Sequence, residues 1–238
     1  MYINHSTAAH NIWLQLKWKV KVHREKMIAL LFIQALLVMM FSNSITYFSA
    51  GFGAVLADIL TPSLDVYAVG SALYMFMLGL YIGTTSNVRE NLTIPTTRTL
   101  TNVSNSLYLL FVSCVTTIVS YSSLYITTAY QLIFHQENLL VNLDEMFSMG
   151  HFIGFICFML LVSAAGYLLA CLFQLRIWLG IVVIVISWLA FQTEFMLFEK
   201  LFYAIVEGEV WLYSLKCFIS ALGLYAIAYL LTAKLEVN

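Results

Sequence analysis

The chain has 238 residues, of which 62% are hydrophobic and only 10% charged, with a net charge of −1 and a mean hydropathy of +0.90. Soluble domains carry about 25% charged residues, and a single core cannot bury so much apolar side chain, which excludes a water-soluble globular domain. Hydrocarbon offers no partners for backbone groups, and the long apolar runs lack the alternation of barrel strands, so the sequence predicts an all-α polytopic membrane protein.

The first 26 residues are mostly polar or amphipathic and do not have the pattern of a cleavable signal peptide. From Leu14 to Val22 apolar and polar residues alternate, which is formally a strand pattern. Because a lone strand beside a membrane would lack a partner, we favour an interfacial amphipathic helix over residues 11–26. Its basic and aromatic anchors would be Trp13, Lys17, Trp18, Lys21 and Arg24. A simple positively charged anchor is the alternative.

Six apolar segments long enough for a hydrocarbon core of about 30 Å follow, within a transmembrane domain at 27–232 and before a tail at 233–238. The segments are 27–48, 66–86, 106–127, 149–173, 177–194 and 211–232. The third is rich in Ser and Thr, whose hydroxyls a helix can return to its own carbonyls. The fourth and fifth are predicted to form a tight helical hairpin.

Two pairs of glycines have the spacing that lets membrane helices approach closely. They are Gly79 with Gly83, and Gly150 with Gly154. Each pair is a candidate contact between spans or protomers, although such spacing is also common by chance.

The charged residues separate to the two sides of this six-span arrangement. With both termini on one side, that side holds nine of the eleven basic residues, and the other holds nine of the twelve acidic ones. The positive-inside rule makes the basic side cytoplasmic. Both termini are therefore expected in the cytoplasm.

The loop after the second span, residues 87–102, carries arginines, a proline and many helix-capping residues. It is too long for a tight turn and too short for a domain. This composition favours a short helix across the cytoplasmic mouth of the bundle, with polar side chains facing a soluble partner. An ordinary connector is the alternative.

Several chemical functions lack their motifs. No H-E-x-x-H, G-x-S-x-G or Walker-type loop occurs, and the five histidines do not pair at ligand spacing within a span. The four cysteines fall within predicted spans without C-x-x-C spacing, which is typical of packed apolar residues and indicates no metal site. An enzyme is therefore not expected.

This layout resembles the membrane-spanning subunit, or permease, of an ABC-2 type ABC transporter. Such permeases have an amphipathic cytoplasmic helix, six spans, a coupling helix between spans two and three, and short outward-facing helices between spans five and six. The corresponding segments here are 11–26, 87–102 and about 195–210. The small size is similar to permeases of bacterial peptide-toxin and bacteriocin export or immunity systems.

The resemblance implies an exporter in the bacterial cell membrane, built from two permease chains, identical or different, and two ABC ATPase subunits. ATP and Mg²⁺ would bind the ATPases, and this chain would bind no cofactor, no metal and no nucleic acid. The residues implied to contact the ATPase are Arg89, Glu90, Asn91, Leu92, Thr93, Ile94 and Arg98.

Almost no ionisable residue falls in the middle of a span, which argues against proton or ion coupling. An amphipathic peptide or lipid-like cargo, moving among membrane lipids, is expected instead. The alternative is a non-transporting sensor or immunity protein that binds a cationic peptide at acidic outer loops. A secondary transporter would be expected to contain internal repeats, and none is evident.

Overall fold

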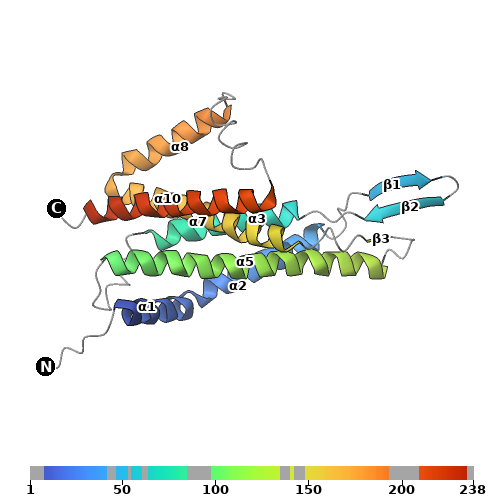
Figure 1. Cartoon of the computed structure of the whole chain (residues 1–238), viewed down its shortest axis with the longest axis horizontal. Helices are drawn as coiled ribbons and strands as arrows, with labels where there is room; N and C mark the ends of the chain where they lie inside the picture. Colours follow the sequence, from blue (N-terminus) through green and yellow to red (C-terminus); the bar gives the residue numbers. More distant parts are fainter. Residues whose placement is uncertain are drawn as a thin grey trace.

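A computed structural model describes residues 8–41, 47–52, 55–60, 64–84, 98–134, 140–141, 148–192 and 209–234. Its helices are α1 (Ala8–Val22), α2 (Arg24–Phe41), α3 (Asp65–Ile82), α5 (Arg98–Phe134), α7 (Met149–Leu175), α8 (Ile177–Gln192) and α10 (Val210–Lys234). From α2 onward they run up and down along one long axis, and α1 lies at the same end as the last turns of α10 (Figure 1).

Four of the described helices are long and apolar enough to cross a membrane, namely α3, α5, α7 and α10. α5 is the longest at 37 residues, because no glycine or proline interrupts the sequence from Arg98 to Phe134. At 1.5 Å per residue it extends for about 55 Å, well beyond the hydrocarbon core.

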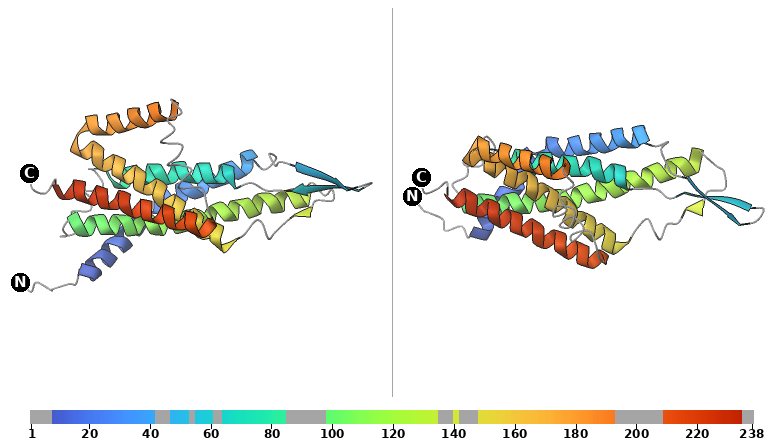
Figure 2. Two further views of the ribbon diagram at one scale, coloured as in Figure 1. Left: turned by 45° about the horizontal axis from the view of Figure 1, so that its top comes forward. Right: turned by 90° about the horizontal axis from the view of Figure 1, so that it is seen from above.

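The other two predicted spans are shorter than expected. The three residues that begin α2, Arg24, Glu25 and Lys26, are charged, so only 27–41 is apolar. α8 has 16 residues, or about 24 Å, and it diverges from the other helices beyond its junction with α7 (Figure 2). The described helices therefore include four candidate membrane spans, and neither α2 nor α8 is among them.

Several predicted boundaries were wrong. The segment 47–48, assigned to the first span, lies in a strand, and Arg24 begins α2 instead of belonging to the N-terminal helix. α5 extends beyond 106–127 in both directions, so residues 98–102 continue the third span and do not form a separate short helix. No terminator separates these turns from the span, because Pro95 lies before the helix and no glycine follows.

Three short strands lie outside the helical bundle, and the hydropathy pattern does not predict them. β1 (Tyr47–Phe52) pairs antiparallel with β2 (Val55–Leu60), with Tyr47 opposite Leu60 and Phe52 opposite Val55. β3 (Leu140–Val141) pairs parallel with β2. The β1–β2 hairpin projects from the end of the molecule opposite α1 (Figures 1 and 2).

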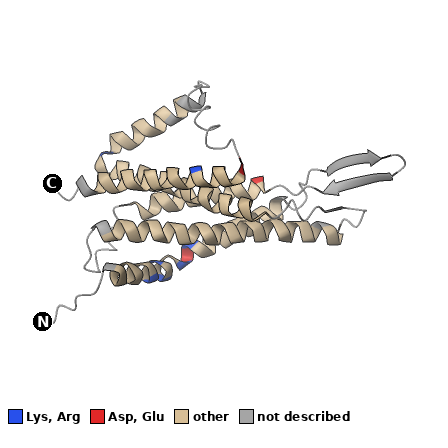
Figure 3. Cartoon of the chain, in the orientation of Figure 1, with Lys and Arg blue, Asp and Glu red and all other residues tan. Residues whose placement is uncertain are grey.

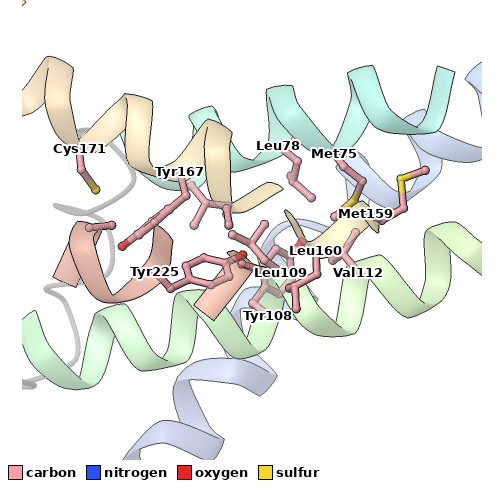
Figure 4. Close-up of a cluster of buried hydrophobic side chains, with 14 residues drawn as sticks. Met75, Leu78, Tyr108, Leu109, Val112, Met159, Leu160, Tyr167, Cys171 and Tyr225 are labelled. Carbon is pink, nitrogen blue, oxygen red and sulfur yellow. The ribbon is translucent and has the colours of Figure 1, made fainter. Parts of the chain in front are cut away.

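The core forms where α3, α5, α7 and α10 pack against one another. Met75, Leu109, Met159 and Tyr167 are among its buried side chains (Figure 4). At the crossing of α3 and α7 the contact is between backbones, because a Cβ at Gly79 would overlap the Ser163 carbonyl oxygen. The crossing is reciprocal, since a Cβ at Gly166 would overlap the carbonyl oxygen of Phe76.

Candidate functional site

The most unusual buried group in the described part of the chain is the ammonium of Lys19, on the face of α1 that packs on the beginning of α5. Its side chain is 0% exposed. Its Nζ donates hydrogen bonds to Asn105 Oδ1 at 2.6 Å, to Ser104 Oγ at 3.0 Å and, at 3.5 Å, to the Thr101 carbonyl oxygen. An ammonium has three N–H groups and no acceptor, so this set provides one oxygen for each donor.

Lys19 has no carboxylate partner among the described side chains. The three acids whose side chains are described, Glu25, Asp65 and Glu209, are all exposed and none of them contacts it. Burial lowers the pKa of Lys19 from its ordinary value of 10.5 to about 7. A buried cation held only by neutral oxygens is costly, which makes this site a candidate for function.

The hydrogen bonds continue from Lys19 into two further helices. Asn105 Nδ2 donates to the Tyr167 hydroxyl on α7 at 3.1 Å, and that hydroxyl donates to Asn102 Oδ1 at 2.9 Å. Asn102 Nδ2 then donates to Thr232 Oγ1 on α10 at 2.6 Å. Every bond points away from the ammonium, so each donor polarises the next. We call this set, Lys19, Ser104, Asn105, Tyr167, Asn102 and Thr232, the lysine network.

The junction of α1 and α2 lies next to the lysine network. His23, the single residue between the two helices, is buried, and its ring lies 5.6 Å from those of Tyr81 and Tyr108. Lys26 Nζ sits 4.5 Å from the centroid of Tyr81, and the Tyr74 hydroxyl donates to the Lys26 carbonyl at 2.8 Å. The junction is therefore held against α3 and α5, which fixes where α1 leaves the bundle.

A second polar cluster lies deeper in the bundle, between α2, α3 and α5. Gln34 Nε2 donates to Ser71 Oγ at 2.7 Å, and Ser71 pairs with Ser120 at 2.6 Å. On the same face the hydroxyls of Tyr67 and Thr127 lie 2.5 Å apart. Such neutral hydrogen bonds are common between packed membrane helices, and here they hold α2, α3 and α5 together.

The hydroxyls of α5 behave as the sequence predicted. Those of Ser113, Thr117, Ser120 and Thr127 each donate to the carbonyl four residues earlier, at 2.8–3.0 Å. Satisfying their donors within the helix lets them lie buried without an external acceptor.

The predicted anchors of the N-terminal segment are distributed as follows. Trp13, Lys17 and Lys21 are exposed on α1, and Arg24 is exposed at the start of α2. Trp18 is half-buried, with its ring 6.4 Å from that of His23.

In the sequence, Lys19 stands out only as one more positive charge of the N-terminal segment. The signal that could have found it is the polar run Gln15, Lys19 and His23, spaced four apart. Gln15 and Lys19 are buried on one face of α1, and His23 is buried directly after its last residue. The hydrophilic start of α5, with Asn102 and Asn105, is the complementary signal.

All four predicted packing glycines are buried between helices. Gly79 and Gly83 of α3 lie against α7, where Gly83 faces Tyr167 and Ala170, and its carbonyl accepts from Gln174 Nε2. Gly150 and Gly154 of α7 lie against Val210 and Ser214 of α10. These glycines therefore sit at contacts within one chain.

The predicted ATPase-contact residues Arg89, Glu90, Asn91, Leu92, Thr93 and Ile94 lie outside the described residues, as does most of the predicted outer segment 195–210. Arg98 is the first residue of α5. On α5 the lysine network begins one turn later, at Asn102, which is the last residue of the predicted docking loop.

Comparisons with protein-family models, with curated proteins and with solved structures gave no match. Among the described residues, no group of His, Cys, Asp and Glu could hold a metal ion, and Cys114, Cys157, Cys171 and Cys217 are free thiols. The function of the chain is therefore inferred from its own residues.

The buried ammonium predicts a pH dependence for the docking of α1. Between pH 7 and 10.5 the undocked Lys19 binds more protons than the docked one, so docking should strengthen as pH rises, by up to about tenfold per unit. Below pH 7 this contribution should be constant. Hydrogen exchange of α1 amides, corrected for intrinsic rates, would measure the effect.

The matched variants are Lys19→Met and Lys17→Met, because Lys17 is exposed on the same helix. Only Lys19→Met should flatten the dependence. A dependence that persists in Lys19→Met would belong to another group and would contradict the assignment.

Proposed function

We propose that this chain is the membrane-spanning subunit of an ABC exporter of the ABC-2 type, driven by separate ATPase subunits. In this proposal α2 and α8 are the two additional spans, completing six. The direction of the helices supports this, because α2, α3, α5, α7, α8 and α10 alternate along the long axis (Figure 1). α2 and α8 would cross with help from flanking residues outside the described ranges or from local thinning of the bilayer.

The charge distribution supports a cytoplasmic location for the end that carries α1. The basic residues of α1 and of the α1–α2 junction gather there, whereas Asp65 and Glu209 begin α3 and α10 at the other end (Figure 3). The positive-inside rule then orients the bundle. Two described residues depart from this pattern, Lys216 on α10 and Glu25 in the first turn of α2.

The observation that carries the proposal is the position of the lysine network. It connects the first turns of α5 to α1, α7 and α10, beginning at the end of the loop expected to dock the ATPase. A displacement of that loop would move the start of α5, and the network would pass the movement to three other helices. α5 itself extends for about 55 Å, so a tilt at one end would displace the other end, on the opposite side of the membrane.

Energetically, the ATPase can drive such a change only by binding the two states of the loop differently. ATP and Mg²⁺ would be held by the ATPases, with a second permease chain completing the assembly. The cargo would be an amphipathic peptide or lipid-like molecule.

Reversal of two loop charges tests the docking assignment. In Arg89→Glu with Arg98→Glu, we expect co-purification of ATPase to fall at least tenfold, because like charges replace attractive contacts, while membrane insertion is unchanged. The readout is the amount of ATPase retained on a tagged permease in mild detergent.

Arg176→Glu is the matched control, since Arg176 lies in the turn between α7 and α8 on the same side of the bundle. It should retain the ATPase. Full retention of the ATPase and full transport in the double variant would contradict the assignment of this loop to the ATPase interface. A stable chain that never binds an ATPase would instead favour the non-transporting sensor that binds a cationic peptide at acidic outer loops.

A further inference from the structure

A groove of about 400 Å³ lies between α2 and α5, a size typical of small-molecule sites. Leu31 and Val38 of α2 and Ile126 of α5 form apolar walls, and Ser123 and Gln34 add polar atoms. Leu31 and Ile126 are more than half exposed, so the groove opens on the outside of the bundle, where a membrane would supply lipid.

The hydrogen bonds beneath the groove fix the orientation of the Gln34 amide. Ser120 donates to the Thr116 carbonyl, so in its pair with Ser71 it must be the acceptor. Ser71 therefore uses its proton on Ser120 and accepts from Gln34 Nε2. This leaves Gln34 Oε1 turned away from Ser71, and it has no hydrogen-bond partner among the described residues.

A buried acceptor without a donor is costly, and Gln34 is 1% exposed. With α2 as a membrane span, as proposed above, Gln34 lies ten residues after Arg24, or about 15 Å along α2, near the middle of a hydrocarbon core of about 30 Å. Water is scarce at that depth, so a bound ligand is the natural source of a donor. An ionised ligand group is disfavoured there, because no charged side chain lines the groove.

We propose that the groove between α2 and α5 binds the hydrocarbon chain of an uncharged amphiphile and that Gln34 accepts a hydrogen bond from its polar group. A long-chain amide or alcohol has the required chemistry. Oε1 is covered by its neighbours, so the contact needs the small adjustment that a terminal amide torsion allows. The assignment of this ligand as cargo rests on the proposed transport function, whereas binding is a property of the chain alone.

Photolabelling of the purified chain tests this binding directly. The probe is a long-chain secondary amide with a diazirine in its alkyl chain, and the matched probe is its N-methyl derivative, which lacks the donor. We expect the N–H probe to label α2 and α5 about fivefold more efficiently, the value of one ordinary hydrogen bond. Gln34→Leu should remove this preference.

Because Gln34→Leu also breaks the bond to Ser71, a second variant keeps that cluster intact. Ala35→Phe fills the groove from its exposed wall and should abolish labelling, whereas Ala29→Phe, exposed on α2 outside the groove, should not. Equal labelling by both probes, or labelling that survives Ala35→Phe, would overturn the proposal. Displacement by an apolar peptide but not by an unlabelled long-chain amide would overturn the ligand class.

The same experiment separates this proposal from the transport function. If labelling follows the groove variants but no ATPase co-purifies with the chain, the binding site stands and the exporter assignment fails. If an ATPase co-purifies and labelling is unchanged in the groove variants, the exporter assignment stands and the binding site fails.

Discussion

Replacement of Gly79 or Gly166 by alanine should markedly lower the unfolding temperature of the bundle and the denaturant concentration needed to unfold it. The same replacement at a glycine with open space around it should not. Each new Cβ would overlap a backbone carbonyl oxygen of the facing helix, Ser163 for Gly79 and Phe76 for Gly166. Backbone cannot move aside as a side-chain tip can, so α3 and α7 must separate. We expect a loss of about 2–4 kcal/mol, which combines strain with lost packing across the crossing.

Gly223→Ala is the matched control, because no atom lies within 4 Å of the position a Cβ would take there. It lies inside α10, where alanine is the better helix former by about 1 kcal/mol, so this variant should be neutral or slightly stabilised. Thermal unfolding in detergent compares the three variants. If Gly79→Ala were as stable as Gly223→Ala, the close crossing of α3 and α7 would be wrong.

Asn105→Leu should destabilise the chain more than removal of the lysine that it holds. At pH 5, below the pKa of about 7, the variant leaves a buried ammonium without its closest acceptor. Release of the proton from Lys19 limits the loss to about 3 kcal/mol, at about 1.4 kcal/mol for each pH unit below that pKa. Lys19→Met removes the charge itself and leaves only neutral oxygens without a hydrogen-bond donor, which should lower the free energy of unfolding by about 1–3 kcal/mol. The double variant should therefore be more stable than Asn105→Leu alone.

Asn102→Leu serves as the control, since Asn102 bonds Tyr167 and Thr232 but not Lys19. It should cost about 1–2 kcal/mol, the value of neutral hydrogen bonds. Unfolding of the four variants under one set of conditions gives the comparison. Either of two results would show that no buried charge is present. In the first, Asn105→Leu and Asn102→Leu lower the free energy of unfolding equally; in the second, the double variant of Lys19→Met with Asn105→Leu is less stable than either single variant.

The helical class and the hydroxyl pattern of α5 could be predicted because both depend on local chemistry. Hydropathy identifies apolar helices without knowledge of their neighbours, and Ser or Thr bonds a carbonyl one turn away in the same helix. Segments 66–86, 149–173 and 211–232 consequently lie within about four residues of the helices α3, α7 and α10.

The errors arose where the outcome depends on distant residues. Hydropathy does not fix where α2 ends or α5 begins, and the strands at 47–60 depend on pairing between segments that have no strong alternation. In the sequence, Lys19 is one of several basic residues. It becomes part of a buried network only because folding places Ser104 and Asn105, which lie 85 and 86 residues later, next to it. Gln34 likewise becomes notable only when Ser71 approaches it.

ATP turnover by an ATPase co-purified with this chain tests the central claim most directly. The proposed coupling predicts that turnover depends on the permease and falls at least several-fold in Asn105→Leu while the ATPase stays bound, because the start of α5 then loses its closest bond to Lys19 on α1 and one of its bonds to Tyr167 on α7. Lack of any bound ATPase, or identical turnover in the wild-type and Asn105→Leu complexes, would contradict the account.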